Sequence, residues 1–192
     1  MDIFRILNCI VLRFFTHFCI LKEIKTAIME NIQFRELHNE DMEFVKSIYE
    51  YYVENSTATF HTGTISIDEL KEFIFINHSV YKSFIIIYNN QPVGYCYFNQ
   101  YKKRQAYDRT AEVTLYIDHA YHGKGIGLSS MQYIETIARE AGLKNLLGII
   151  TGENTPSINL FEKCGYEKCA HFKNIGEKFN RLLDVVAFQK EI

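Results

Sequence analysis

Apolar residues follow two periods along the chain after Asn31. Alternation of apolar and polar residues, typical of strands with one buried face, predicts seven strands. They are expected at residues 31–37, 83–88, 93–100, 112–118, 146–151, 166–172 and 183–189. Apolar residues three and four positions apart predict helices that begin at Asn39 or Glu40, at Ser66, near Leu128 and at Asn154. The order β-α-α-β-β-β-α-β-α-β-β predicts an α/β or α+β domain, a mixed sheet with helices on both faces.

Capping residues mark the ends of two of these helices. Ser66, with Glu69 three residues later, has the spacing of a capping box. Gly142 is expected to end the long helix, because glycine readily adopts the left-handed conformation found there.

The first 28 residues differ from the rest of the chain. Their apolar residues could form one helical stripe that docks on the domain or on a partner: Ile3, Ile6, Leu7, Ile10, Phe14, Phe18 and Leu21. Asp2, Arg5 and Arg13 argue against a transmembrane helix, and no small-residue cleavage site for secretion follows. We favour a simpler interpretation, with Met29 as the natural start. Residues 1–28 are then an upstream extension, and residues 29–192 form the domain.

Composition narrows the class of protein. The 192 residues, 47% of them hydrophobic and 23% charged, suffice for one soluble domain with a core. A net charge of −2 gives no general attraction to nucleic acid or membrane, and we expect neither as a partner. The five cysteines are odd in number and lack C-x-x-C spacing, which favours a reducing cytoplasmic location over a disulfide framework or zinc site. His119 and His122 lack an evident third ligand, so no metal is expected.

A glycine-rich corner lies between the strand that begins at Glu112 and the long helix. Residues 121–127 read YHGKGIG. Glycines there allow a tight turn and leave N–H groups facing outward at the positive end of a helix dipole. The corner therefore predicts a phosphate or pyrophosphate site, although such corners also occur as plain turns. No Ser or Thr follows Gly123-Lys124, which excludes a P-loop, and the G-x-G-x-G spacing does not fit a dinucleotide fingerprint.

With these motifs in place, the chain resembles the GNAT superfamily of acetyl-CoA-dependent N-acetyltransferases over about residues 31–190. The element order matches, as do the coenzyme signature at residues 122–127 and the segments 154–157 and 160–166. A closer match, to the phosphinothricin acetyltransferase-like branch, is carried by residues 52–60, 104–112 and 183–186. The resemblance implies a GNAT-type, mostly antiparallel sheet flanked by helices.

The resemblance also implies where acetyl-CoA would bind. Its pyrophosphate would lie on backbone N–H groups of the glycine corner, with a lysine at the rim: Gly123, Lys124, Gly125, Ile126, Gly127 and Leu128. Its pantetheine arm would pair with the backbone of Leu115, Tyr116 and Ile117, as a peptide pairs with a strand edge. Asn154 would contact the same arm, and a role as helix N-cap is compatible with that contact.

In this family an amine attacks a thioester, and an ammonium must first lose a proton. Glu112 is the candidate general base, directly or through a water, since a half-buried carboxylate has a raised pKa. The alternative is an ordinary polar position on a strand. Arg104 and Tyr107 would line the acceptor pocket, where a cation and a phenol suit a carboxylate or phosphinate; otherwise they belong to a solvated basic loop. Phe60 would form an apolar wall of the pocket, or part of the core.

Three residues depart from the family pattern. His122 replaces Arg or Gln at the first signature position, which phosphate binding by backbone amides should tolerate. Phe161 stands where the branch often has His and other members have Tyr. It cannot give a proton to a leaving thiolate, which argues against phosphinothricin itself as the substrate. Leu182 replaces a common Trp.

Together these features predict an acetyl-CoA-dependent enzyme that acetylates the primary amine of a small amino-acid-like acceptor, of the phosphinothricin or methionine sulfoximine type. One alternative is a protein or peptide N-acetyltransferase of the same fold. Another is a module that binds acetyl-CoA without turnover. The resemblance suggests a homodimer, to which exposed aromatic residues on the last strands would contribute.

Overall fold

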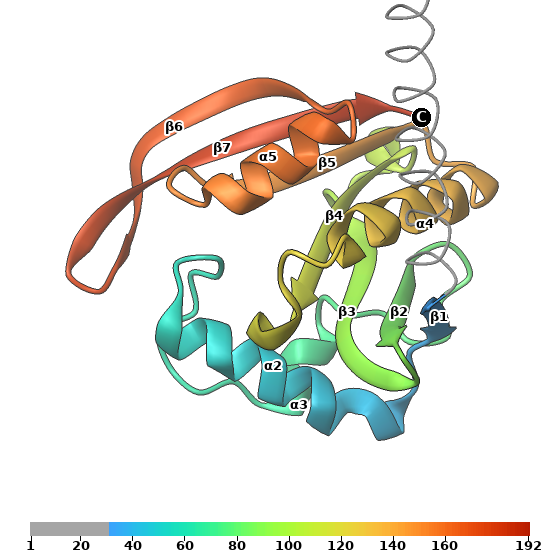
Figure 1. The fold of residues 1–192 in the computed structure, drawn as a ribbon. Coiled ribbons are helices and arrows are strands. Elements are labelled where there is room, and N and C mark those ends of the chain that lie inside the picture. The colour runs from blue at the N-terminus through green and yellow to red at the C-terminus, as the bar shows by residue number, and fades with distance from the viewer. Residues whose placement is uncertain (1–30) are drawn as a thin grey trace, which may run out of the picture.

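A computed structural model describes residues 31–192, so the expectation for residues 1–28 lies outside the described part of the chain. One seven-stranded sheet has the order β1-β2-β3-β4-β5-β7-β6 (Figure 1). Its strands are β1 (Ile32–Glu36), β2 (Lys82–Tyr88), β3 (Gln91–Gln100), β4 (Thr110–Ile117), β5 (Asn145–Thr151), β6 (Glu167–Lys178) and β7 (Arg181–Glu191). Every neighbouring pair is antiparallel except β4 and β5. The predicted fold class, a mixed and mostly antiparallel sheet with helices, is confirmed.

Helices cover both faces of the sheet. They are α2 (Met42–Asn55), α3 (Ile67–Lys71), α4 (Ile126–Glu140) and α5 (Thr155–Lys163), with short 3₁₀ helices η1 (Asn39–Asp41), η2 (Gln105–Tyr107) and η3 (His119–Tyr121). The capping box at Ser66 and Glu69 is present, and Gly142 has a φ of +87° just after α4, so both predicted helix ends are confirmed.

The alternation of side chains along the strands divides the core into two clusters. On β4, Ala111 and Val113 join the cluster that includes the buried face of α4, whereas Tyr116 joins the cluster that includes α2. Side chains of odd number on β4 therefore face α4 and α5, and those of even number face α2 and α3. Glu112 and Thr114 consequently lie on the α2 face of the sheet.

The parallel pairing of β4 with β5 is short. It covers only Thr110 to Glu112 on β4, although β4 continues to Ile117 and β5 to Thr151. Over its whole length β5 pairs instead with β7. The sheet thus opens after Glu112 into one part made of β1–β4 and another made of β5–β7 (Figure 1).

The loop of residues 56–61 bridges this opening. Four consecutive carbonyls, Ser56 to Thr59, accept hydrogen bonds from side chains of three strands. The buried Lys178 ammonium donates to Ser56 (2.7 Å) and Thr59 (2.8 Å), and Thr151 and Tyr116 donate to the two carbonyls between them. Burial lowers the pKa of Lys178. Lys178 therefore joins the outer end of the β6–β7 hairpin to the 56–61 loop.

The β6–β7 hairpin is longer than the alternation alone indicates. Its two-residue turn places Phe179 and Asn180 at φ of +54° and +57°, which suits the twist of a tight hairpin. A bulge lies between Phe172 and Gly176, where Asp184 accepts hydrogen bonds from the backbone N–H of Asn174 and from His171. The predicted strands at 166–172 and 183–189 are confirmed, but both stop short of the hairpin turn, because the bulge interrupts the period of two. In the structure β6 continues to Lys178, and β7 already begins at Arg181.

Replacing Lys178 by Met should destabilise the fold, because the carbonyls of Ser56 and Thr59 lose their donor in a buried place. The expected loss in free energy of unfolding is about 1–3 kcal/mol, measured by urea denaturation. Lys168→Met, at an exposed position of the same strand, is the control and should change stability by less than about 0.5 kcal/mol. Equal stability of the two variants would contradict this role of Lys178.

Candidate active site

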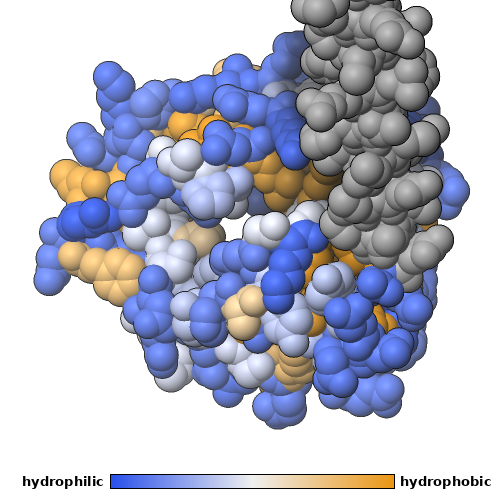
Figure 2. Space-filling view, viewed as in Figure 1, coloured by the Kyte–Doolittle hydropathy of each residue, from blue (hydrophilic) through white to orange (hydrophobic). Residues whose placement is uncertain are grey.

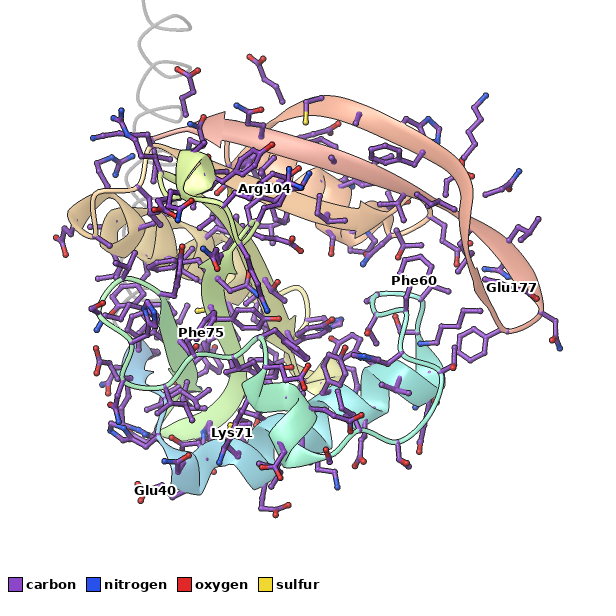
Figure 3. The ribbon with its side chains drawn as sticks, turned by 180° about the vertical axis from the view of Figure 1, so that it is seen from behind. Glu40, Phe60, Lys71, Phe75, Arg104 and Glu177 are labelled. Atoms are coloured by element: carbon purple, nitrogen blue, oxygen red, sulfur yellow. The ribbon has the colours of Figure 1, made fainter. Side chains whose placement is uncertain are left out.

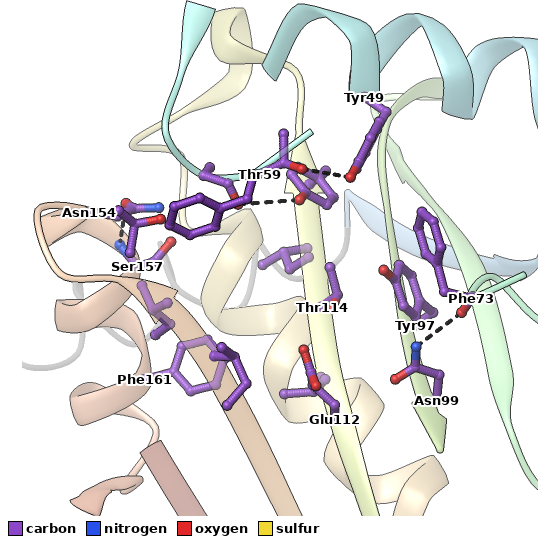
Figure 4. A pocket seen from close by; sticks show the side chains of 18 of the residues that line it. Tyr49, Thr59, Phe73, Tyr97, Asn99, Glu112, Thr114, Asn154, Ser157 and Phe161 are labelled. Atoms are coloured by element: carbon purple, nitrogen blue, oxygen red, sulfur yellow. Dashed lines mark hydrogen bonds between the residues drawn. The ribbon is translucent and has the colours of Figure 1, made fainter. Parts of the chain in front are cut away.

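A cavity of about 350 Å³ lies where β4 and β5 separate. It is lined by residues 113–116 of β4 and 149–151 of β5, that is, by both strands beyond their pairing. Other lining residues lie on the α2 face of the sheet, namely Tyr49, Phe73, Tyr97, Asn99 and Glu112. Further ones come from α5 and the residue before it, namely Asn154, Ser157, Leu160 and Phe161 (Figure 4). The cavity therefore reaches both faces of the sheet through the opening.

The edge of β4 along this cavity carries free backbone groups. The N–H of Asp118 donates to Val93 on β3, whereas the carbonyl of Arg109 accepts from the segment that leads into β5. Because backbone groups alternate in direction along a strand, even residues bond to β3 and odd residues face the opening. The bridge of Glu112 to Leu147 uses the N–H of Val113, so the C=O of Val113 and both the N–H and C=O of Leu115 face the cavity without a partner strand.

The three residues of β4 that were predicted to bind the coenzyme consequently differ in where their backbone groups are directed. Leu115 presents its backbone to the cavity as expected, but the backbone of Tyr116 is directed to β3. The carbonyl of Ile117 already accepts hydrogen bonds from Tyr52 and His122. Val113, which the resemblance did not suggest, adds a free C=O group.

The glycine corner leaves the start of α4 without a side-chain cap. Gly123 and Gly125 have φ of +76° and +78°, and Gly125 is the N-cap residue. The first N–H groups of the helix, Ile126 to Leu128, are therefore free of a capping side chain, at the positive end of the helix dipole. The ammonium of Lys124 lies over the ring of Tyr121, 4.5 Å from its centre. This arrangement can bind an anion such as a phosphate.

Gly127 connects this corner to the cavity. The corner itself is not part of the cavity lining, but Leu115 and Leu160 are. A Cβ atom at Gly127 would lie 3.2 Å from Leu160 and 3.7 Å from Leu115. The absence of a side chain thus keeps space beside two leucines that line the cavity.

The start of α5 forms part of the cavity wall. Asn154 is the N-cap residue, accepting from the N–H of Ser157 at 3.2 Å, and it also lines the cavity. The N-cap role is confirmed, and the amide nitrogen of Asn154 remains available as a donor. About two turns further on, Phe161 is buried against Gly148 of β5, where a Cβ atom would lie 2.1 Å from the ring. Its ring therefore gives this part of the wall no proton donor.

Glu112 lies on the α2 face of the cavity, next to Asn99 across the ladder to β3 (Figure 4). Burial alone raises the pKa of its carboxyl, with no neighbouring cation to lower it. Such a carboxylate can accept a proton from a group in the cavity.

The three residues predicted to bind the acceptor lie in two different places. Phe60 lines the cavity, with its ring against Gly176 of the hairpin. Arg104 and Tyr107 lie in the loop around η2 and do not line the cavity. The ring of Tyr107 is covered there by the ammonium of Lys102, 5.6 Å from its centre. Figure 3 shows Arg104 and Phe60 at separate parts of the molecule.

Several residues of the α2 face escaped the sequence analysis, among them Tyr49, Thr59, His61, Phe73, Tyr97 and Asn99. A sequence signal existed for two of them. Tyr97 and Asn99 alternate on β3 and lie opposite Thr114 and Glu112, so the hairpin register would have placed them beside the candidate base. The others depend on how the 56–61 loop folds over the sheet.

The raised pKa of Glu112 should make stability depend on pH. The unfolded carboxyl ionises near its ordinary value of 4.5, before the folded one, so the wild type loses stability as pH rises from there through the folded pKa. Glu112→Gln lacks this titration. Its melting temperature in thermal unfolding should therefore rise relative to wild type as the pH increases from the ordinary value of 4.5 through the folded pKa. A constant difference across this range would contradict the raised pKa.

Within residues 31–192, no helix is long and apolar enough to cross a membrane, and no group of three or more His, Cys, Asp or Glu side chains could hold a metal ion.

Comparison with known proteins identifies the family. Residues 33–166 match the acetyltransferase (GNAT) family. The chain is 30% identical over 160 residues to YwnH of Bacillus subtilis, a candidate phosphinothricin acetyltransferase, covering 82% of this chain and 98% of YwnH. It is 26% identical to the phosphinothricin N-acetyltransferase of Streptomyces viridochromogenes, covering 83% of this chain and 87% of that protein.

A solved structure shows the same fold. It is a GNAT superfamily phosphinothricin acetyltransferase of Sinorhizobium meliloti in complex with acetyl-CoA, with a TM-score of 0.78 and 23% identity over 84% of this chain and 89% of that one. The match over residues 33–166, on a sheet that opens between β4 and β5, shows that this chain belongs to the GNAT family of acetyltransferases.

Proposed function

We propose that this chain transfers the acetyl group of acetyl-CoA to the primary amine of a small amino-acid-like acceptor, with Glu112 as the general base. The observation that carries the proposal is the opening between β4 and β5, through which one cavity reaches both faces of the sheet. A coenzyme on the α4 and α5 face and an acceptor on the α2 face can meet there. The relatives named for phosphinothricin acetylation support an acceptor of this size and class.

The coenzyme side follows from the free backbone groups. The uncapped N–H groups at the start of α4 would bind the pyrophosphate, with Lys124 adding a positive charge. The space beside Gly127 lets the pantetheine arm run from the corner into the cavity. There the outward C=O of Val113 and the N–H and C=O of Leu115 would pair with its amides, as a strand edge pairs with a peptide. The side-chain amide of Asn154 offers one more donor.

The chemistry then needs one acceptor of protons. Glu112 takes a proton from the incoming ammonium, directly or through a water, and the freed lone pair forms a C–N bond to the thioester carbonyl carbon. An outward N–H of β4 would stabilise the negative charge on the carbonyl oxygen. The C–S bond breaks and the coenzyme leaves as a thiolate, while the second proton of the nitrogen passes to solvent. Phe161 has no proton to give, so in this mechanism the thiolate leaves unprotonated.

Phe161 favours a second candidate function, an acetyl-CoA-binding module without turnover. A peptide acceptor has less support, because the 56–61 loop bridges the opening and limits access to the cavity. Release of free thiol from acetyl-CoA distinguishes the candidates, with a panel of amino acids, phosphinothricin, methionine sulfoximine, methionine sulfone, peptides and polyamines. Turnover of amino-acid-like amines is the expected result. Tight binding of acetyl-CoA without any turnover would favour the module.

Location and assembly also form part of the proposal. Cys96, Cys164 and Cys169 are free thiols, which fits the reducing cytoplasm expected from composition. We further propose a homodimer, because apolar side chains are exposed towards the outer end of the β6–β7 hairpin, where Figure 2 shows hydrophobic colour on the left of the molecule. They are Phe172, Ile175, Phe179 and Leu182.

The Glu112→Gln variant tests the base. It should lower kcat by about 10²–10⁴-fold, because the amide cannot accept the proton. Its Kd for acetyl-CoA, measured by isothermal titration, should stay within about twofold of wild type, since the coenzyme is bound elsewhere along the cavity. Glu167→Gln, at an exposed position of β6, is the control and should match wild type in both quantities. An unchanged kcat in Glu112→Gln would exclude Glu112 as the base.

The homodimer is tested by the mass of the protein in solution. Ile175 and Leu182 are each 62% exposed in the single chain. Replacing both by Glu should turn a dimer into a monomer in light scattering, because unpaired charges would then be buried in the interface. Tyr51→Glu, an exposed aromatic on α2, should remain dimeric. A monomeric wild type would contradict the proposal.

A further inference from the structure

The cavity contains few groups that could recognise a negative charge on the acceptor. An amino-acid-like acceptor carries an anionic group beside its amine. Among the residues that line the cavity, Glu112 is acidic and His61 alone can become a cation. Arg104, the residue expected to hold such a group, lies outside the lining. The structure thus leaves one candidate for binding an anion within this cavity.

The imidazole of His61 is held in place by a ring of hydrogen bonds. Its backbone N–H donates to Thr59 Oγ1 at 3.3 Å, Thr59 Oγ1 lies 2.6 Å from the hydroxyl of Tyr49, and that hydroxyl lies 2.5 Å from His61 Nδ1. The side chain of Tyr49 is buried. The ring of Phe73 stacks on the imidazole, with 6.3 Å between the ring centres. One hydrogen bond and one ring contact therefore orient the imidazole, although His61 as a whole is exposed.

This arrangement leaves Nε2 as the ring nitrogen free to meet a ligand. The hydroxyl of Tyr49 can donate to Nδ1 of a neutral imidazole, which places the proton on Nε2, or accept from Nδ1 of an imidazolium. In both states Nε2 carries a hydrogen that can be donated. An anion in the cavity would favour these states over the tautomer with its proton on Nδ1 alone.

We infer that His61 binds the carboxylate of the acceptor through Nε2 and thereby selects amino acids over simple amines. The inference rests on the proposed function and names its specificity-determining residue. The charges of the cavity match those of a zwitterion, with Glu112 as the anion for the ammonium and His61 as the donor for the carboxylate. Figure 4 shows Glu112 and the Tyr49–Thr59 pair, which holds His61, at different positions along the cavity.

A pair of acceptors that differ only in the carboxylate tests this role. L-methionine sulfone and its decarboxylated form, 3-(methylsulfonyl)propylamine, are compared in the thiol-release assay with wild type and His61→Phe. The KM for the amino acid should rise about tenfold or more in the variant, because a hydrogen bond to a charged group is lost. The KM for the decarboxylated amine should stay within about twofold, and kcat should change little. His61→Gln, which keeps an N–H donor, should recover part of the loss.

Arg104→Gln serves as the matched comparison, since it removes the cation of the η2 loop. It should leave the preference for the amino acid intact. If Arg104→Gln raises the KM of the amino acid selectively and His61→Phe does not, the inference is overturned and the basic loop holds the carboxylate. If His61→Phe weakens both acceptors equally, His61 has only a structural role, and the inference is likewise wrong.

Binding in the absence of turnover separates this inference from the proposed function. Isothermal titration of L-methionine sulfone is carried out in the presence of coenzyme A, with wild type and His61→Phe. Binding that depends on His61, together with no thiol release from any amine, would overturn the proposed acetyl transfer but support His61 as the carboxylate site. Turnover of simple amines, together with no binding of amino acids, would support the proposed acetyl transfer but overturn His61 as the carboxylate site.

Discussion

The separation of β4 from β5 is the constraint on which the rest of the structure depends. The two strands pair over Thr110 to Glu112 and then diverge, because β5 follows β7 along its whole length. The divergence leaves backbone groups of β4 without a partner, and unpaired backbone groups in a cavity are costly unless a ligand or water satisfies them. It also gives the cavity access to both faces of the sheet. An extended coenzyme arm on one face and an amine on the other are the ligands that such an opening fits best.

The opening would be a weakness without the contacts that bridge it. The 56–61 loop bonds to β4 through Tyr116, to β5 through Thr151 and to β6 through Lys178. These donors satisfy consecutive carbonyls of the loop, so the loop can lie over the sheet without leaving buried acceptors unpaired. The same loop carries Thr59 and His61 into the cavity. Joining the two parts of the sheet and shaping the acceptor side are therefore tasks of one segment.

Most of the fold could be predicted from sequence, because each element carries its own local signal. Alternation and helical spacing gave the order of elements, and Ser66 and Gly142 gave helix ends that the structure bears out. The glycine corner indicated an anion site from local chemistry alone. What the sequence did not reveal depends on three-dimensional divergence: no periodicity indicates that β4 leaves β5 after Glu112. For the same reason the resemblance suggested Tyr116, whose backbone is bonded to β3, and not Val113.

The acceptor side was the hardest part to predict. Its residues come from five separate segments, and the 56–61 loop has no regular period by which His61 could have been placed. The Lys102–Arg109 loop attracted attention through its charge, which is a property of composition and not of position.

Amide hydrogen exchange along β4 tests most directly whether its free edge holds the coenzyme. Exchange of Val113, Thr114 and Leu115 is followed by NMR with and without acetyl-CoA, with binding verified by titration. The N–H of Leu115 should exchange more slowly when the coenzyme is bound, whereas those of Val113 and Thr114 should be slow in both states because they are already bonded to β5 and β3. Unchanged exchange of Leu115 in a protein that has bound acetyl-CoA would show that the arm does not lie along this edge.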